Sequence, residues 1–254
     1  GYIVSSLGPV LYFLTHKNDT ITLAKTKLEF PIIFKCIGNG LSDFIFNVSS
    51  SIIGVVFNIQ ALRYIGEQGV IAYGVIMYLS FIFLAVFIGL NLGMAPIISY
   101  NYGAQNRKEL RSVVKKVLII FFVSSICMIL IGLLLSRPLS HLFCKEAELI
   151  DLCSKALIIY NFAYLFAGFC FFITSMFTAL NNGLVSGILS FLRLLVLQIL
   201  FAFILPLIFG ADGLWWSFAA SECVSMFISF IFLFKNKKKY FDDIPNTEQI
   251  DEAK

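Results

Sequence analysis

Charged residues are scarce in this sequence of 254 residues. Asp, Glu, Lys and Arg make up 13% of the chain, against about 25% in a typical soluble domain, while hydrophobic residues make up 59%. A surface of that composition cannot be solvated, which excludes an ordinary soluble domain. Apolar runs long enough to cross ~30 Å of hydrocarbon as helices recur between short polar connectors. The sequence therefore predicts an all-α, polytopic bundle of transmembrane helices.

The chain also lacks the residue patterns of metal centres and of membrane-embedded enzymes. Its 6 cysteines and 2 histidines are scattered, without a Cys-x-x-Cys pair or a His-rich cluster, which argues against a metal cage or a disulfide framework. Cys144 and Cys153 are the one pair that could meet within a connector, and free thiols are the expected state. No His-Glu-x-x-His motif, pair of intramembrane aspartates or Ser/His arrangement is present. We therefore expect no enzymatic activity, no metal and no organic cofactor.

Apolar runs and their breakers divide the chain into four parts. Residues 1–14 are interpreted as the end of a preceding helix, 15–35 as a polar linker between two bundles, 36–234 as a six-helix lobe and 235–254 as a solvated tail. The six full spans are expected near 36–62, 69–98, 113–135, 155–178, 184–209 and 213–234.

Lysine and arginine fall in alternate connectors, which predicts the orientation because basic connectors stay on the cytoplasmic side. The basic segments are 15–35, 107–116 and 235–239, so the linker and the tail are expected in the cytoplasm of a protein of the plasma (cytoplasmic) membrane. Anionic lipid and this topology account for the net charge of +4, and no nucleic-acid partner is needed. The less basic connectors, expected outside, contain Arg63 with Glu67, the segment 137–151, and Asp212.

One expected helix carries a polar stripe. Asn39, Asp43 and Asn47 recur at i, i+4 and i+8 and so share a helix face. The functional interpretation is a water-accessible wall on which Asp43 binds H⁺, Na⁺ or a cationic substrate, and the structural one is that Asp43 only bridges neighbouring helices. We favour the functional interpretation, because contacts between membrane helices use Ser, Thr or Asn more often than an ionisable group.

Arg193 and Glu222 are the other charged residues at membrane depth. Each is a candidate buried partner of the other, and Arg193 could instead extend to the cytoplasmic headgroups, so we favour a structural role for both. A second polar face is expected in the span near 155–178, where the candidate cavity residues are Tyr160, Asn161 and Tyr164, together with Thr174 and Ser175.

Residues 89–107 read GLNLGMAPIISYNYGAQNR. Through Gly89, Gly93, Pro96 and the NYGA stretch, this segment resembles the cytoplasmic end of the second helix in each half of the multidrug and toxic compound extrusion (MATE) family. The resemblance covers roughly residues 30–234, because four further stretches agree in order: 58–73 (NIQALRYIGEQGVIAY), 137–143 (RPLSHLF), 178–183 (TALNNG) and 205–222 (LPLIFGADGLWWSFAASE).

The resemblance implies one six-helix lobe of a two-lobe transporter in the lipid bilayer, with the N-terminal lobe as its missing partner. It implies antiport, in which inward flow of H⁺ or Na⁺ drives export of amphipathic, often cationic compounds. Asp43 falls where many members hold an acidic residue implicated in cation binding, and Glu222 matches a position where some members have Glu. Members with a Na⁺ site place a further aspartate in the fourth helix of this lobe, but residues 155–178 contain no acidic residue.

Two other functions compete with drug antiport. A lipid-linked oligosaccharide flippase of the same superfamily would share the architecture, but such proteins typically line their cavity with several arginines, and Arg193 alone does not favour one. A seven-helix receptor fits the number of apolar segments, but the last segment lacks the deep lysine that would hold retinal.

Overall fold

The computed structural model describes residues 7–8, 11–12 and 29–241, and the chain divides into two compact units, 1–36 and 37–254. Most of the predicted helix end at 1–14 and of the linker at 15–35 lies outside the described residues. Residues 37–241 are the described part of the second unit, and helix α2 begins before it, at Phe30.

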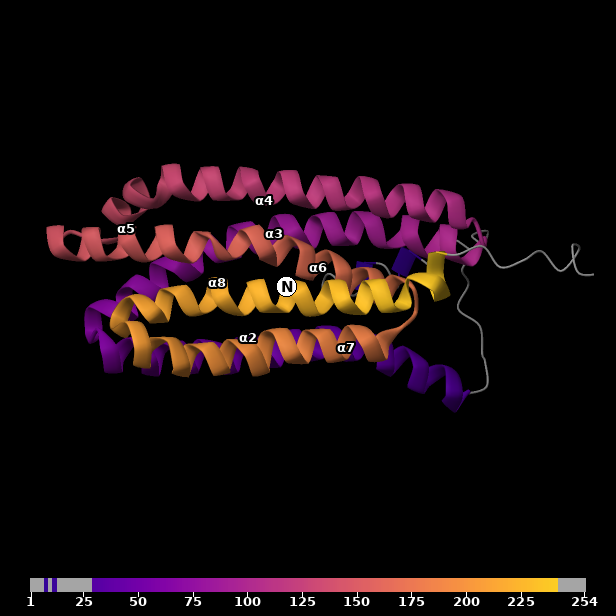
Figure 1. Cartoon of the computed structure of the whole chain (residues 1–254), viewed down its shortest axis with the longest axis horizontal. Coiled ribbons are helices and arrows are strands. Elements are labelled where there is room, and N and C mark those ends of the chain that lie inside the picture. Colours follow the sequence, from indigo (N-terminus) through magenta and orange to yellow (C-terminus); the bar gives the residue numbers. More distant parts are fainter. Residues whose placement is uncertain (1–6, 9–10, 13–28, 242–254) are drawn as a thin grey trace, which may run out of the picture. The chain divides into compact units, whose positions relative to one another are not determined.

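The described part of this unit consists of helices and contains no strand, which confirms the all-α transmembrane bundle (Figure 1). In chain order the elements are α2 (Phe30–Tyr64), α3 (Glu67–Gly103), α4 (Arg107–Phe143), α5 (Ala147–Asn161), α6 (Ala163–Ala179), α7 (Gly183–Phe191), the π-helix η1 (Leu192–Leu197) and α8 (Gln198–Phe241).

Three helices, α2, α3 and α4, are each long and apolar enough to cross a membrane, and α5 and α6, bent by 41° at the break between them, are together long and apolar enough for one more crossing. The continuous helical stretch Gly183–Lys237 has 55 residues, roughly 80 Å at 1.5 Å per residue, which is far longer than one crossing requires. The chain turns back at Gly210, so this stretch makes two antiparallel crossings (Figure 1). Five of the six spans expected from hydropathy lie on continuous helical segments, and the span near 155–178 is broken at Phe162, between α5 and α6.

Two glycines make the turn between these last two crossings possible. Gly210 has φ 61° and ψ −139°, a backbone conformation that is essentially confined to glycine. A Cβ atom on Gly213 would lie 2.3 Å from the backbone oxygen of Leu205, so only glycine lets the two segments approach this closely. We call the segments on either side of the bend the 183–209 crossing and the 211–241 crossing.

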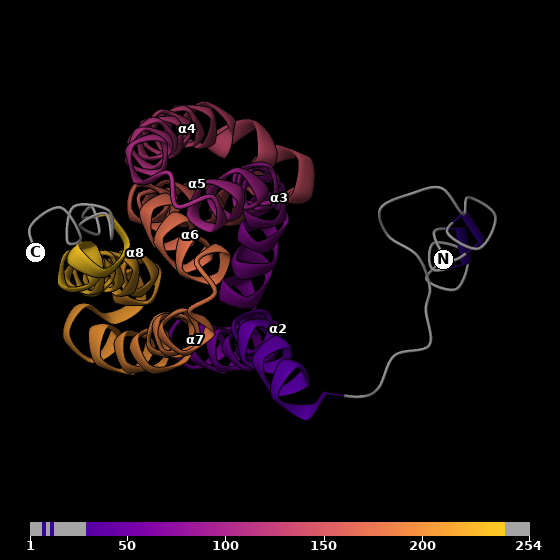
Figure 2. The same cartoon turned by 90° about the vertical axis from the view of Figure 1, so that its right-hand side faces the viewer.

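Viewed from its end, the bundle places α2 beside the 183–209 crossing, next to a larger group formed by α3 to α6 and the 211–241 crossing (Figure 2). Gln60 of α2 donates a hydrogen bond to the backbone oxygen of Ala202 at 3.1 Å. The ring of Phe57 stacks on Tyr73 of α3 and meets Phe218 of α8 edge-on. Aromatic contacts therefore join the two groups of helices.

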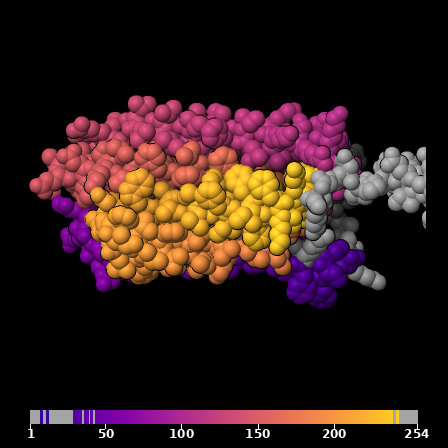
Figure 3. Space-filling view, viewed as in Figure 1, coloured from indigo at the N-terminus to yellow at the C-terminus, as the bar shows by residue number. Residues whose placement is uncertain are grey.

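Large apolar side chains cover the outer surface of α8, which runs along the middle of the face drawn in Figure 3. They include Leu207, Phe227, Ile231 and Phe234, all strongly exposed. Apolar side chains on the outside are what a helix needs in order to face lipid.

The NYGA stretch, residues 101–104, ends α3 and leads into the turn before α4. Gln105 adopts a left-handed φ of 56°, and the side chain of Asn106 caps α4 by accepting a hydrogen bond from the backbone N–H of Glu109. The turn before α7 repeats this arrangement, with a left-handed Asn181 followed by Asn182 as the N-cap.

Both turns lie at the end of the bundle where α8 ends (Figure 1). Arg107 donates a hydrogen bond to the backbone oxygen of Tyr240 at 2.6 Å, and Arg111 to that of Phe241 at 2.5 Å. The hydroxyl of Tyr240 accepts a hydrogen bond from Asn182 at 2.7 Å. Two arginines of the predicted cytoplasmic segment thus satisfy the last carbonyl groups of α8 and complement its dipole.

Helix α4 continues beyond the expected span end at residue 135, as far as Phe143. The segment 137–143, expected as an amphipathic connector, forms its last turns, with Pro138 inside the helix. A helix that leaves the hydrocarbon can continue into the headgroup region with polar side chains, so hydropathy marks the apolar part of α4 and not its end.

Candidate functional site

Two adjoining cavities lie among α2, α3, α5, α6, α7, η1 and α8. The aromatic cavity has a volume of about 350 Å³ and the polar cavity one of about 480 Å³. The residues that line both are Phe46, Asn47, Phe171, Arg193 and Leu194.

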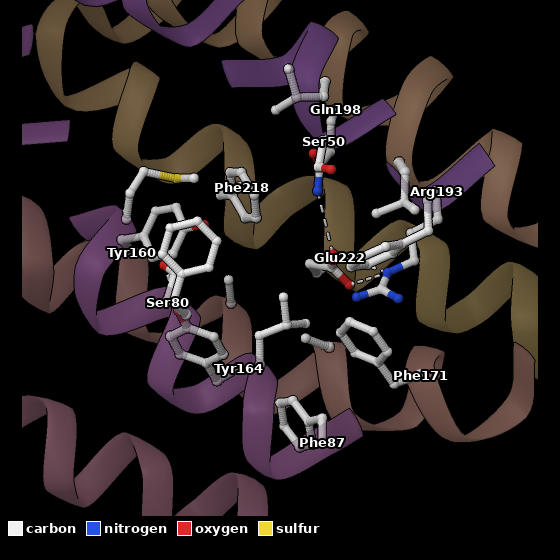
Figure 4. A pocket seen from close by; sticks show the side chains of 18 of the residues that line it. Ser50, Ser80, Phe87, Tyr160, Tyr164, Phe171, Arg193, Gln198, Phe218 and Glu222 are labelled. Atoms are coloured by element: carbon white, nitrogen blue, oxygen red, sulfur yellow. Dashed lines mark hydrogen bonds and ion pairs between the residues drawn. The ribbon is translucent and has the colours of Figure 1, made fainter. Parts of the chain in front are cut away.

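Eight aromatic side chains line the first cavity, several of which are labelled in Figure 4. Tyr160 packs against Phe218 with ring centroids 4.4 Å apart, and the hydroxyl of Tyr164 lies 2.7 Å from Ser80 Oγ. Rings in this arrangement offer their negative faces to a bound cation and a flat apolar surface to its hydrocarbon parts. The aromatic lining comprises Phe46, Tyr73, Phe81, Phe87, Tyr160, Tyr164, Phe171 and Phe218.

A buried ion pair stands at one side of this cavity. Arg193 donates through Nε to both carboxylate oxygens of Glu222, at 3.0 and 2.9 Å. Gln198 lies 3.4 Å from one of those oxygens, and the guanidinium lies 4.2 Å above the centre of the Phe171 ring. Only 7% of the Arg193 side chain and 2% of the Glu222 side chain are exposed, so each charge depends on the other for compensation.

Arg193 reaches this position from a π-helical segment. Residues Leu192–Leu197 form η1 within the 183–209 crossing. A π-helical turn inserts an extra residue and so changes the direction in which the following side chains leave the helix; such turns occur frequently at functional sites.

Oxygen-bearing side chains line the polar cavity. Asp43 and Asn47 come from one face of α2, and Asn91 comes from α3. The side-chain oxygens of Asn91 and Thr174 are buried and have no hydrogen-bond partner among the residues that the structure describes. Carboxylate, amide and hydroxyl oxygens are the ligands that hard cations such as Na⁺ favour. The cavity also contains Ser175, Thr178 and Ser190.

The structure divides the predicted site residues between the two cavities. Asp43 lines the polar cavity, Asn47 lines both, and Tyr160 and Tyr164 line the aromatic cavity. Asn39 lies on α2, but its side chain falls outside the described residues. Arg193 and Glu222 are each other's partner, and both line the aromatic cavity.

The predicted position of Asn161 in a cavity needs correction. Asn161 does not line a cavity with Tyr160 but faces α4, where its amide donates a hydrogen bond to the backbone oxygen of Ile129 at 2.7 Å. Its side chain fills the space beside Gly132, where a Cβ atom would lie 2.3 Å from Asn161 Oδ1. Adjacent residues of a helix point about 100° apart, so Tyr160 and Asn161 cannot share one face.

Several residues that line the aromatic cavity were not predicted from the sequence. Tyr73 and Ser80 are seven residues apart on α3 and so lie on one face, a spacing that could have identified them, and both line the aromatic cavity. No pattern singled out Gln198 or Phe171, because their role comes from contacts with Glu222 and Arg193.

A protein-family model, MatE, matches residues 43–204, which is more than half of the chain. The chain belongs to the MatE family. Among curated relatives of this MatE protein, the multidrug export protein MepA of Staphylococcus haemolyticus is 26% identical over 93% of the chain, and MepA of Staphylococcus aureus (strain MSSA476) is 24% identical over 93%. The MatE chain spans about half the length of these relatives, 52% and 53% respectively.

Solved structures share the fold. An outward-facing multidrug resistance MATE family transporter superimposes with a TM-score of 0.84 at 20% identity, over 94% of this MatE chain and 54% of that one. A MOP superfamily transporter from Pyrococcus furiosus, described as having a binding pocket of reverse polarity, superimposes with a TM-score of 0.81 at 22% identity, over 92% of this MatE chain and 53% of that one. The predicted resemblance to the MATE family is confirmed. MatE proteins are transporters, which confirms the prediction that the protein is not an enzyme and shows that the interpretation as a receptor is wrong.

Proposed function

We propose that this MatE protein supplies one lobe of a cation-coupled multidrug antiporter. The aromatic cavity receives amphipathic, often cationic compounds, and Asp43 in the polar cavity binds the coupling ion, H⁺ or Na⁺. The observation that carries the proposal is that the two cavities adjoin and that each contains a carboxylate, Glu222 in one and Asp43 in the other.

The lining of the aromatic cavity favours a cationic or neutral compound over an anionic one. Among the described residues, Arg193 is the only lysine or arginine that lines either cavity, and Glu222 already neutralises it. A flippase that carries a lipid-linked phosphate needs uncompensated cations, because phosphate is recognised by arginine and lysine donors. Drug antiport is therefore favoured over the flippase alternative.

Antiport requires that the ion and the drug favour opposite-facing states or exclude one another, since a ligand moves an equilibrium only by its differential affinity. The adjoining cavities satisfy the spatial condition, because they share Asn47 and Arg193. Alternating access by rocking also needs a second lobe to move against this one. We infer that a second lobe is a partner of residues 37–254, in the bilayer of the cytoplasmic membrane with the basic end of the bundle facing the cytoplasm.

The proposal is tested in inverted membrane vesicles from cells that express the full reading frame containing these 254 residues. Ethidium uptake, which reports export in this orientation, is followed by fluorescence while a proton or a sodium gradient is imposed separately. We expect uptake to depend on one of the gradients and to stop when an ionophore dissipates it. Uptake driven by ATP with both gradients dissipated, or no uptake under either gradient, contradicts the proposal.

A further inference from the structure

Arg193 lines both cavities, and each cavity contains one carboxylate. Glu222 lines only the aromatic cavity, where Figure 4 shows its ion pair with Arg193, and Asp43 lines only the polar cavity. The hydrogen bonds of Arg193 to Glu222 use Nε, one of five N–H donors on a guanidinium group. The two terminal nitrogens of the Arg193 guanidinium can therefore contact a second carboxylate before Nε releases Glu222.

We propose that Arg193 is an internal competitor for cationic ligands at Glu222, and that Asp43 determines which carboxylate holds it. When H⁺ or Na⁺ neutralises Asp43, Arg193 stays on Glu222, as in this structure, and the aromatic cavity rejects organic cations. When Asp43 is ionised and empty, Arg193 turns to Asp43, and Glu222 receives the organic cation against the aromatic wall. This inference rests on the proposed function and adds to it the residue that links ion to drug.

Two physical conditions lead to this exchange. An organic cation cannot pair with Glu222 while Arg193 occupies both carboxylate oxygens, because two cations beside one buried carboxylate leave a net charge in a medium of low dielectric. Arg193 in turn cannot leave Glu222 without a new partner, since an unpaired buried charge is strongly destabilising. Among the described residues that line the two cavities, Asp43 is the only other acidic side chain.

The other titratable side chains that face Arg193 and Glu222 are phenols and a thiol, which are ordinarily neutral at neutral pH. Glu222 is faced by the phenols of Tyr160 and Tyr164 and by the thiol of Cys170, whose sulfur lies 3.7 Å from the Glu222 backbone oxygen. Apart from Arg193, the described residues that line the polar cavity with Asp43 are uncharged. Among the described residues, Asp43 is therefore the one carboxylate of the two cavities that Arg193 does not hold in this structure.

A double-mutant cycle tests the exchange directly. The 254-residue protein is purified in lipid nanodiscs, and ethidium binding is measured by fluorescence anisotropy for the unmodified chain, Asp43→Asn, Arg193→Gln and the combination of both. We expect Asp43→Asn to weaken ethidium binding by roughly tenfold, within the range of ordinary couplings between sites, because Arg193 then has no second partner. In the Arg193→Gln background the same change must have no effect, because the competitor is gone.

The outcomes separate this mechanism from a simpler one. If ethidium binds Asp43 directly, Asp43→Asn weakens binding equally in both backgrounds, and the proposal is overturned; no effect in either background overturns it too. Should Arg193→Gln fail to fold, Arg193→Gln/Glu222→Gln, which leaves neither charge of the buried pair, replaces it as the background, and Asp43→Asn must again leave the residual binding unchanged.

A matched control and a second assay complete the design. Lys155→Gln breaks another ion pair, with Asp212 at 2.6 Å, in a part of the protein that lines neither cavity, and must leave ethidium affinity unchanged. Vesicle export by the full reading frame distinguishes the two levels of proposal. If export is driven by a gradient but Asp43→Asn has the same effect on ethidium binding with and without Arg193, only the competition by Arg193 is contradicted. If the effect of Asp43→Asn depends on Arg193 but no export occurs, only the antiport function is contradicted.

Discussion

Arg193 and Glu222 join the two crossings on either side of the Gly210 bend. Arg193 belongs to the 183–209 crossing and Glu222 to the 211–241 crossing, and the ion pair at 2.9 Å connects them inside the bundle. The same two side chains thus serve the packing of the hairpin and form the charged side of the aromatic cavity.

Removal of one partner of this pair is expected to destabilise the protein more than removal of both. Glu222→Leu leaves the Arg193 guanidinium buried without a counter-charge, which costs roughly 3–5 kcal/mol, whereas the double variant Arg193→Met/Glu222→Leu replaces the pair by apolar groups at little net cost. Thermal denaturation in detergent, followed by size-exclusion chromatography, measures the difference. A single variant as stable as the double one contradicts the prediction. The exposed pair of Lys155 and Asp212 is the control, and Lys155→Ala is expected to cost at most about 1 kcal/mol.

Gly213→Ala is expected to disrupt the turn at the end of the 183–209 crossing. The added Cβ would meet the backbone oxygen of Leu205 at 2.3 Å, and a backbone atom cannot give way as the end of a flexible side chain can. We expect a lower melting temperature and a smaller yield of monodisperse protein. Gly74→Ala in α3 is the matched control, because nothing lies within 4 Å of its added Cβ and alanine favours a helix by up to about 1 kcal/mol. Equal stability of the two variants would show that the close approach is absent.

Asn161→Ala is expected to lower stability without changing ethidium affinity. The substitution removes the hydrogen bond to Ile129 and the side chain packed on Gly132, and a typical net contribution of such a hydrogen bond is about 1 kcal/mol. Tyr164→Phe, which loses the contact with Ser80 inside the aromatic cavity, should instead weaken ethidium binding. Weaker ethidium binding by Asn161→Ala would contradict this prediction and show that Asn161 contributes to the binding site.

The orientation is tested by single cysteines in a background without the 6 native ones. We expect Lys108→Cys to react with an impermeant maleimide only from the cytoplasm, and Glu67→Cys and Glu148→Cys only from outside, because all three positions are exposed at connectors and basic connectors stay inside. The helices already place the turn near Lys108 at one end of the bundle and the other two turns at the opposite end (Figure 1). Labelling of all three from the same side contradicts the topology.

The fold was largely predictable because membrane helices are determined by apolar length, which can be read directly from the residues. The starts of α4 at Asn106 and of α7 at Asn182 agree with local sequence preferences, since asparagine is a favoured N-cap. The bend at Gly210 and the π-helix around Arg193 could not be predicted from the sequence, because both depend on how two crossings pack.

The candidate site was only partly predictable for a related reason. Charge at membrane depth identified Asp43, Arg193 and Glu222, because such residues are costly wherever they lie. Periodicity then grouped Asn161 with Tyr160, although the two face different helices. Which polar residues share a cavity depends on helix rotation, and one helix alone does not reveal it.

Gradient-driven export by Asp43→Asn, in the full reading frame containing this chain, is the most direct test of the proposed antiport. Asparagine keeps the size of the side chain and its capacity for hydrogen bonds but removes the charge that binds H⁺ or Na⁺. We predict that the variant inserts normally into the membrane but no longer exports ethidium in response to an ion gradient, while Asn39→Ala and Asn47→Ala reduce export less. If Asp43→Asn exports ethidium at the unmodified rate and with the same dependence on pH and Na⁺, then Asp43 does not couple the ion to the drug.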